Sequence, residues 1–181
     1  MRFTANTTPV TRTQLEHVIR AAGAIAGSRE LVVIGSQALL AAVPDAAGIL
    51  AQSMEVDLYP ADNPAKADLV DSCIGELSLF HETYGYYAHG VGPQTAILPD
   101  RWRLRARIVE SAQTDGVRAI CLHPIDLAIS KLAAGRERDL TFVTAMLQKS
   151  CVTVPEIEAA LTELPEAAAT RVRQMLPGLR S

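Results

Sequence analysis

The chain has 181 residues, of which 49% are hydrophobic and 20% are charged, a composition typical of one substantial globular domain. The 17 Lys and Arg residues and the 20 Asp and Glu residues give a formal net charge of −3. This balance excludes a strongly basic nucleic-acid coat, although it leaves room for a local basic cleft.

The sequence has no feature typical of a membrane or secreted protein. No apolar run reaches the roughly 18 residues that span a bilayer, and residues 1–6 lack the apolar stretch of a secretory signal. The three cysteines, Cys73, Cys121 and Cys151, are odd in number, widely spaced and in apolar contexts. We therefore expect reduced, half-buried thiols in a cytoplasmic protein that has no contact with a membrane.

The first predicted elements are a helix and a buried strand. Residues 1–10 carry no periodic pattern and predict a loose arm. A capping box at Thr11 or at Thr13 then begins a helix, which ends before Gly27. Residues 30–34 form a short, mostly apolar run, which is typical of a strand buried on both faces.

A second strand follows after a longer connection. Residues 37–43 predict a short helix, and residues 45–53 predict a loop with one helical turn. Residues 54–59 alternate between apolar and polar side chains and predict a strand. Pro64 is expected at the first position of the next helix. Its buried stripe is predicted to consist of Leu69, Cys73, Ile74 and Leu77.

The middle section is rich in turns, and residues 95–98 predict a short strand within it. Residues 101–108 predict the clearest strand of the chain, because four arginines alternate with apolar residues. Asp115-Gly116 predicts a hairpin turn into a strand over residues 117–122.

Everything from Pro124 onward is predicted to be helical. Pro124 begins one helix that Gly135 ends, and Pro155 and Pro165 stand near the starts of further helices. The order of elements predicts an α+β fold, a sheet flanked by helices with a C-terminal helical bundle. We expect residues 1–122 to form the α/β core and residues 123–181 to pack on it as one compact unit.

Two short motifs carry the main candidate chemistry. Gly35-Ser36 directly follows a buried strand, and such a turn at a helix start offers backbone N–H groups and a hydroxyl to phosphate oxygens. Glu55 and Asp57 stand two residues apart on the next strand, so both carboxylates project from one face and suit Mg²⁺ bound to a triphosphate. Either motif alone is more typical of a helix cap or of a solvated strand face. Their succession, with apolar neighbours around both acids, favours a cation site.

Basic residues supply further candidates. Lys131 stands in an apolar stretch, where a lysine either extends to solvent or meets an anion. Arg136, Arg138 and Asp139 follow at the start of the next helix, either as surface pairs or as groups that bind and orient phosphates.

The predicted strand over residues 101–108 has an arginine face with three interpretations. It is a solvated edge strand, a clamp on a triphosphate, or a contact to the backbone of an RNA or DNA acceptor. For nucleotide binding we single out Arg105 and Arg107.

The remaining His and Cys residues give weaker signals. The pairs Cys121/His123 and His81/His89 do not have a four-ligand zinc spacing. Cys121 lies on an apolar strand, which predicts an inert thiol.

A family resemblance rests on these motifs. Ile34-Gly35-Ser36, followed by Met54-Glu55-Val56-Asp57-Leu58, resembles the signature of the DNA polymerase β-like nucleotidyltransferase superfamily. The string from Leu122 to Leu140, with its Asp-Leu, Lys-Leu and Arg-Glu-Arg-Asp-Leu segments, is similar to the AbiEii-type toxin nucleotidyltransferases and related bacterial proteins. The resemblance covers roughly residues 30–147.

The resemblance implies a fold, a reaction and partners. The fold would be a nucleotidyltransferase-like mixed sheet, and the protein would bind NTP with Mg²⁺ and transfer a nucleotidyl group to a hydroxyl of tRNA or of a protein. A role as the toxin of a toxin–antitoxin pair would imply a cognate antitoxin. By position, Ser36 would hold the triphosphate with Gly35, Glu55 and Asp57 would bind the metal, and Lys131 and Asp139 would complete the catalytic site.

Three departures from the family pattern keep a second interpretation open. Residues 37–54 put 18 residues between Ser36 and the first acid, which is longer than usual, and that acid is Glu rather than Asp. A third acid on a neighbouring strand is also missing, because the strand that the sequence offers carries the arginines and Glu110 is out of phase with it. Asp139 is the candidate substitute. The alternative function is a non-catalytic nucleotide-binding or regulatory module, and three converging carboxylates would favour the enzyme.

Overall fold

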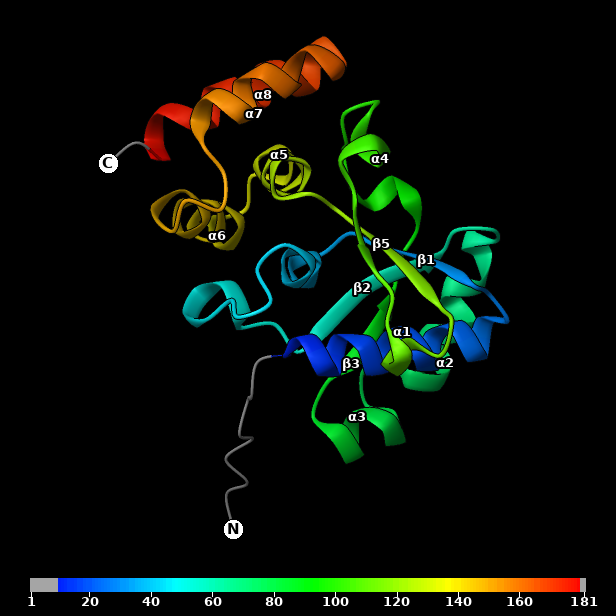
Figure 1. The fold of residues 1–181 in the computed structure, drawn as a ribbon. Coiled ribbons are helices and arrows are strands. Elements are labelled where there is room, and N and C mark those ends of the chain that lie inside the picture. Colours follow the sequence, from blue (N-terminus) through cyan, green and yellow to red (C-terminus); the bar gives the residue numbers. More distant parts are fainter. Residues whose placement is uncertain (1–9, 180–181) are drawn as a thin grey trace.

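The computed structural model describes residues 10–179, so the predicted N-terminal arm lies almost entirely outside the described residues. Five strands form one mixed sheet in the order β3-β2-β1-β5-β4 (Figure 1). β1 pairs in parallel with β5, β2 pairs in parallel with β3, and the β1–β2 and β4–β5 pairs are antiparallel. The strands are β1 (Glu30–Val33), β2 (Glu55–Pro60), β3 (Tyr87–Gly90), β4 (Arg107–Val109) and β5 (Arg118–Cys121).

Two helices cover one face of the sheet, α1 (Arg12–Ala26) and α2 (Ala67–Ile74). The capping box of α1 forms between Thr11 and Gln14, and Gly27 ends the helix in the left-handed conformation at φ 61°. The apolar positions of α1 recur at helical spacing, and their side chains are fully buried. Short helices, η3 (Pro64–Lys66) and α3 (Leu79–Tyr84), flank α2.

The other face carries η1 (Ser36–Ala41), and the C-terminal helices pack against it through α5 (Pro124–Ala134). α5 contacts α6 (Glu137–Gln148), α7 (Val154–Ala160) and α8 (Glu166–Met175), and α6 also packs on η2 (Gly48–Ala51). Pro124 begins α5, and Gly135 ends it at φ 66°. The remaining short elements are η4 (Pro93–Thr95), α4 (Trp102–Arg105), η5 (Ala112–Thr114), η6 (Leu161–Glu163) and η7 (Leu176–Leu179).

The mixed sheet with flanking helices and a C-terminal helical bundle confirms the predicted α+β class. A single hydrophobic cluster runs from the strands into α5, α6 and α8. The turn predicted at Asp115-Gly116 is also present, with positive φ at both residues, in the connection between β4 and β5. No helix among residues 10–179 is long and apolar enough to span a membrane.

The predicted buried stripe of α2 is confirmed at Ile74 and wrong at its other three positions. Leu69 is 47% exposed, Cys73 is exposed and Leu77 is 90% exposed, whereas Val70 and Ile74 are buried. The first turn after Pro64 is a 3-10 helix, so the α-helical repeat begins only at residue 67 and the buried positions shift in phase.

The strand predicted over residues 101–108 is also wrong, as is the one over residues 95–98. Residues 102–105 form α4, and only residues 107–109 join the sheet as β4. The turn begins at Pro99, whose carbonyl accepts a hydrogen bond from the N–H of Trp102 at 3.1 Å. Alternation of charged and apolar residues over so short a span fits both conformations, and here the helical turn brings Arg105 to the fully buried Asp126.

The thiols match the sequence interpretation in part. Cys73, Cys121 and Cys151 are all free, as expected, but their burial ranges from exposed through intermediate to complete. Burial raises the pKa of Cys121 to about 12, so this thiol is protonated at neutral pH and inert as a nucleophile, as expected.

A histidine on α1 makes stability depend on pH. His17 Nδ1 lies 2.7 Å from the Tyr86 hydroxyl, and burial, then the positive charge of Arg20, lower the pKa of His17. The unfolded chain therefore binds more protons than the folded chain as the pH falls below about 6.5, and stability decreases there. We expect the free energy of unfolding in urea to fall less between pH 7.5 and 5.5 in His17→Gln than in the wild type. Equal decreases in both proteins would contradict this.

Candidate functional site

An open pocket of about 670 Å³ lies where η1, η2 and β2 meet α5 and α6. Among its lining residues are most of the candidates that the sequence predicts, brought together from three distant segments. They are Ser36, Glu55, Asp57, Lys131, Arg136, Arg138 and Asp139.

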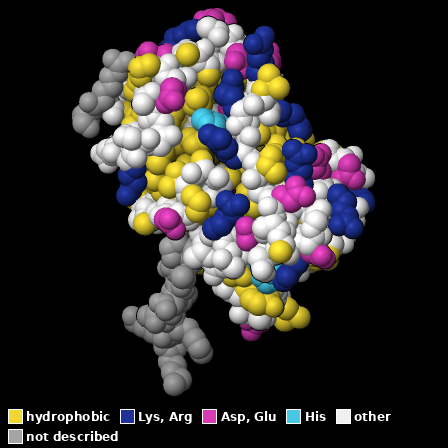
Figure 2. All heavy atoms as spheres, viewed as in Figure 1, with side chains coloured by type: hydrophobic (Ala, Val, Ile, Leu, Met, Phe, Trp, Pro, Cys, Tyr) yellow, Lys and Arg dark blue, Asp and Glu magenta, His cyan; other side chains and the backbone are white. Residues whose placement is uncertain are grey.

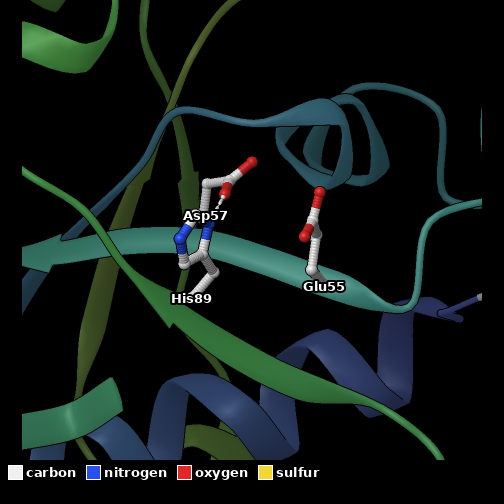
Figure 3. Close-up of side chains that lie close together, drawn as sticks. All are labelled: Glu55, Asp57 and His89. Atoms are coloured by element: carbon white, nitrogen blue, oxygen red, sulfur yellow. Dashed lines mark hydrogen bonds and ion pairs between the residues drawn. The ribbon is translucent and has the colours of Figure 1, made fainter. Parts of the chain in front are cut away.

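The two acids of β2 share one face of the sheet. Val56 and Leu58, between and beyond them, are fully buried, so the period of the strand turns Glu55 and Asp57 to the opposite face. Figure 3 shows both carboxylates projecting from β2 toward η1.

Gly35 makes room for the second acid. A β-carbon at position 35 would overlap the Asp57 carboxylate and stand 2.7 Å from its Cγ, whereas the φ of −86° needs no glycine. The glycine is therefore required by the close approach of Asp57 and not by its backbone conformation.

We expect Gly35→Ala to displace the Asp57 carboxylate and to lower the free energy of unfolding by about 1–3 kcal/mol. A rise in melting temperature caused by Mg²⁺ plus NTP should be lost in the same variant. Gly178→Ala is the matched control, because a β-carbon there meets no atom within 4 Å. Retention of the full ligand-dependent rise in Gly35→Ala would contradict this role.

Each acid of β2 has a partner on β3. The parallel register places Tyr87 beside Glu55 and His89 beside Asp57. The Tyr87 hydroxyl donates to Glu55 Oε2 at 3.3 Å. His89 Nδ1 lies 2.7 Å from Asp57 Oδ1, as Figure 3 shows. One ligand atom from each of Glu55, Asp57 and His89 lies within 4.8 Å of the others.

The negative charges of Glu55 and Asp57 help to raise the pKa values of Tyr87 and His89. Burial, and then the negative charge of Glu55, raise the pKa of Tyr87 to about 12. Burial lowers the pKa of His89, but its hydrogen bond to Asp57 and the negative charge of that carboxylate outweigh this, and the pKa is raised.

The strand beside the two acids is therefore β3, and not the arginine strand that the sequence suggested. It carries His89, where a third acid was sought, and Glu110 lies outside the pocket. The signal in the sequence was the spacing of Tyr87 and His89, which repeats that of Glu55 and Asp57. It was missed because a four-residue strand among glycines gives little periodic pattern.

The opposite wall of the pocket holds Lys131 and Asp139. Lys131 Nζ donates to Asp139 Oδ1 at 3.3 Å and lies 4.5 Å from the centre of the Phe142 ring. The side chains of Lys131 and Asp139 are only 15% and 7% exposed. Asp139 Oδ2 is buried with no hydrogen-bond partner among the described residues, since the nearest guanidinium nitrogen, Arg136 Nε, is 3.9 Å away.

Two predicted nucleotide-binding residues lie outside this pocket. Arg105 donates to both oxygens of Asp126, at 2.8 and 3.2 Å, and to both oxygens of Glu163, at 3.0 and 3.1 Å. Arg107 lies 3.4 Å from His123 Nε2 and also does not line the pocket. The helical turn of α4 breaks the expected arginine face, so the structure does not bring these two residues to the site.

The surface charge is mixed. Figure 2 shows Lys and Arg side chains interspersed with acidic and hydrophobic side chains on the face in view. This face carries no continuous basic track of the kind that follows a nucleic-acid backbone.

The fold and the site together define a class of protein. A Gly-Ser turn after one strand, two acids on the adjacent strand and a mixed sheet flanked by helices are the arrangement of the nucleotidyltransferase superfamily. Residues 13–175 match a family described as "Nucleotidyltransferase of unknown function (DUF6036)", and the chain belongs to this family. No curated protein and no solved structure matches the chain.

The two carboxylates of the site fit Mg²⁺, the divalent cation that nucleotidyltransferases typically use. Glu55 and Asp57 offer carboxylate oxygens, the ligands that Mg²⁺ prefers, and the open pocket leaves further coordination positions to water and to phosphate oxygens. The space that Gly35 leaves for the Asp57 carboxylate keeps that group at the pocket.

Proposed function

We propose that this protein binds NTP and Mg²⁺ in the pocket and transfers a nucleotidyl group to a hydroxyl of an acceptor. The observation that carries the proposal is that the pocket joins Ser36, the acids of β2 and Lys131. Membership of a nucleotidyltransferase family supports the class of reaction.

Different residues of the pocket would bind different parts of the NTP–metal complex. The hydroxyl and backbone N–H of Ser36 would hold phosphate oxygens, and Glu55 and Asp57 would hold the metal. Mg²⁺, when bound, neutralises the triphosphate and polarises the phosphorus–oxygen bonds. Lys131, with Arg136 or Arg138, would offset the remaining charge of the leaving pyrophosphate, and Asp139 would orient Lys131.

The chemistry of the step follows from this placement. The acceptor hydroxyl oxygen forms a bond to the α-phosphorus, the bond between that phosphorus and the pyrophosphate oxygen breaks, and the hydroxyl proton passes to solvent. The chain contributes by positioning both reactants and by providing positive charges that stabilise the negative charge developing on pyrophosphate.

The likeness of residues 122–140 to AbiEii-type toxins supports a narrower proposal. Under it, the acceptor is tRNA or a protein, a cognate antitoxin restrains the activity, and the protein acts in the cytoplasm, where its thiols stay reduced. Residues 1–122 would then be the catalytic core and residues 123–181 the helical part that supplies Lys131 and Asp139.

One observation favours a second candidate, a non-catalytic nucleotide-binding or regulatory module. The strand beside Glu55 and Asp57 carries His89 where polymerising members of the superfamily have a third acid. Binding of NTP without transfer to any acceptor would support this candidate over the enzyme.

Nucleotide binding is tested on Lys131. A contact between its ammonium group and a phosphate contributes about 1.5–3 kcal/mol, so Lys131→Ala should weaken NTP binding in calorimetry by that amount. Lys149→Ala is the matched control, because Lys149 is exposed and lies outside the pocket.

The same variant has a structural effect that must be separated from binding. Removing the ammonium group leaves the buried Asp139 with only the exposed Arg136, 3.9 Å from Oδ2, so Lys131→Ala should also be less stable. The double variant Lys131→Ala/Asp139→Asn removes this poorly compensated charge and should regain stability without regaining affinity. An unchanged NTP affinity in the single variant would remove Lys131 from the proposed site.

A further inference from the structure

His89 lies close to both acids of β2 and not only to Asp57. It stands beside Asp57 in the parallel register of β2 and β3, so both side chains leave the same face of the sheet. Its Nδ1 lies 2.7 Å from Asp57 Oδ1, and one of its ring nitrogens lies within 4.8 Å of a Glu55 carboxylate oxygen as well. Figure 3 shows the imidazole beside the carboxylate of Asp57, with Glu55 further along the same strand.

A second feature of the pocket indicates that a ligand belongs there. The Asp139 side chain is only 7% exposed, and its Oδ2 is buried with no hydrogen-bond donor among the described residues, because its ion-pair neighbour Arg136 Nε is 3.9 Å away. Asp139 lines the same pocket as Glu55 and Asp57. Because an unsatisfied buried carboxylate oxygen is costly, a donor such as a metal-bound water or a ligand hydroxyl is expected in this space.

We propose that His89 is the third protein ligand of the metal held by Glu55 and Asp57, and that this mixed oxygen and nitrogen donor set selects Mn²⁺ over Mg²⁺. The inference rests on the proposed function, because it concerns the metal of the same site. It refines that function by naming the class of cation, a first-row transition ion.

The selectivity follows from the chemistry of the donors. Mg²⁺ is a hard ion that prefers oxygen ligands and gives up its waters reluctantly, so an imidazole nitrogen adds little to its affinity. First-row transition ions accept imidazole readily, and Mn²⁺ combines this with a preference for carboxylates. Two carboxylates that line the open pocket, with one imidazole beside them, therefore favour Mn²⁺, while water and phosphate oxygens can still complete the coordination shell.

Pulsed electron paramagnetic resonance of Mn²⁺ added to the full-length protein tests this without reference to activity. We expect a coupling between bound Mn²⁺ and an imidazole ¹⁴N in the wild type, and its loss in His89→Asp. His81→Gln is the matched control, because His81 is a neighbouring imidazole that is not one of the three ligands; its ring centre lies 4.5 Å from that of Tyr87.

Competition between Mn²⁺ and Mg²⁺ provides the second readout. His89→Asp places a third carboxylate at this position. In this variant the ratio of the Mg²⁺ to the Mn²⁺ dissociation constant should fall by about tenfold or more. Changes in groups that only support metal ligands already alter metal affinity by about this much. His89→Asp keeps a ligand at this position, so a failure to fold would show as loss of binding of both ions, and His89→Gln then serves as the replacement variant.

The results of the Mn²⁺ and NTP binding experiments distinguish a failure of the His89 proposal from a failure of the proposed function. If the wild type binds no Mn²⁺, or binds it without ¹⁴N coupling and with a ratio that His89→Asp leaves unchanged, the role of His89 is overturned. If NTP binding measured separately still requires both a metal and Asp57, the proposed function survives that result. If ¹⁴N coupling is present but NTP does not bind, the metal site stands and the proposed function falls.

Discussion

Asp57→Asn is expected to reduce nucleotidyl transfer by about a thousandfold, the scale of effect when one group that stabilises transition-state charge is removed. The same variant should lose the rise in melting temperature that a metal plus NTP gives beyond NTP alone, because ligand binding stabilises only the state that binds. The reason is local. A carboxamide is a poor ligand for a divalent cation, and the space beside Gly35 holds the side chain of residue 57 where it is.

The stability of the unliganded Asp57→Asn protein shows whether the loss of activity comes from the lost metal ligand or from unfolding. Asn removes the repulsion between two carboxylates on one strand face and also the ion pair with the partly exposed His89, and these changes oppose one another. The free energy of unfolding should therefore change by no more than about 1 kcal/mol. Asp45→Asn, an exposed acid outside the pocket, is the control. A metal-dependent shift of wild-type size in Asp57→Asn would exclude the proposed metal site.

Arg105→Ala is expected to lower the free energy of unfolding by about 3–5 kcal/mol while leaving NTP affinity unchanged. Asp126 is fully buried, and Arg105 donates to both of its oxygens and also to Glu163. Removing the guanidinium leaves an uncompensated charge in the core between α4 and α5, which is far more costly than the loss of a surface pair.

Two further variants test whether the loss of stability comes from the buried pair of Arg105 and Asp126. Arg103→Ala removes an exposed arginine of the same helix whose guanidinium lies 4.8 Å from the centre of the Trp102 ring, and it should cost about 1 kcal/mol or less. The double variant Arg105→Met/Asp126→Leu replaces the pair by apolar side chains and should recover much of the lost stability. If Arg105→Ala instead kept its stability and bound NTP more weakly, Arg105 would be a phosphate ligand, as its sequence pattern alone suggested.

Those parts of the fold that depend on neighbours in the sequence were predictable. The capping box at Thr11, the αL glycine after α5 and the alternation along β2 each act within a few residues. For the same reason, the shared direction of Glu55 and Asp57 follows from the period of a strand.

Features that depend on distant contacts were not predictable in the same way. Arg105 lies on a helical turn because Asp126, 21 residues further on, is buried and needs a cation. His89 reaches the acids only because β3 pairs in parallel with β2, and a four-residue strand bounded by glycine carries too little pattern to predict that pairing. The shift of phase in α2 came from a 3-10 turn that the helical repeat does not reveal.

The central claim, that this pocket transfers nucleotidyl groups, is tested most directly by label transfer. The full-length protein is incubated with each NTP labelled at the α-phosphate, with Mg²⁺ or Mn²⁺, and with total RNA and cell protein as acceptors. We expect covalent label on an RNA or a protein, released pyrophosphate, and loss of both in Asp57→Asn. Bound NTP with no label on any acceptor in either metal would contradict it and leave a non-catalytic nucleotide-binding module.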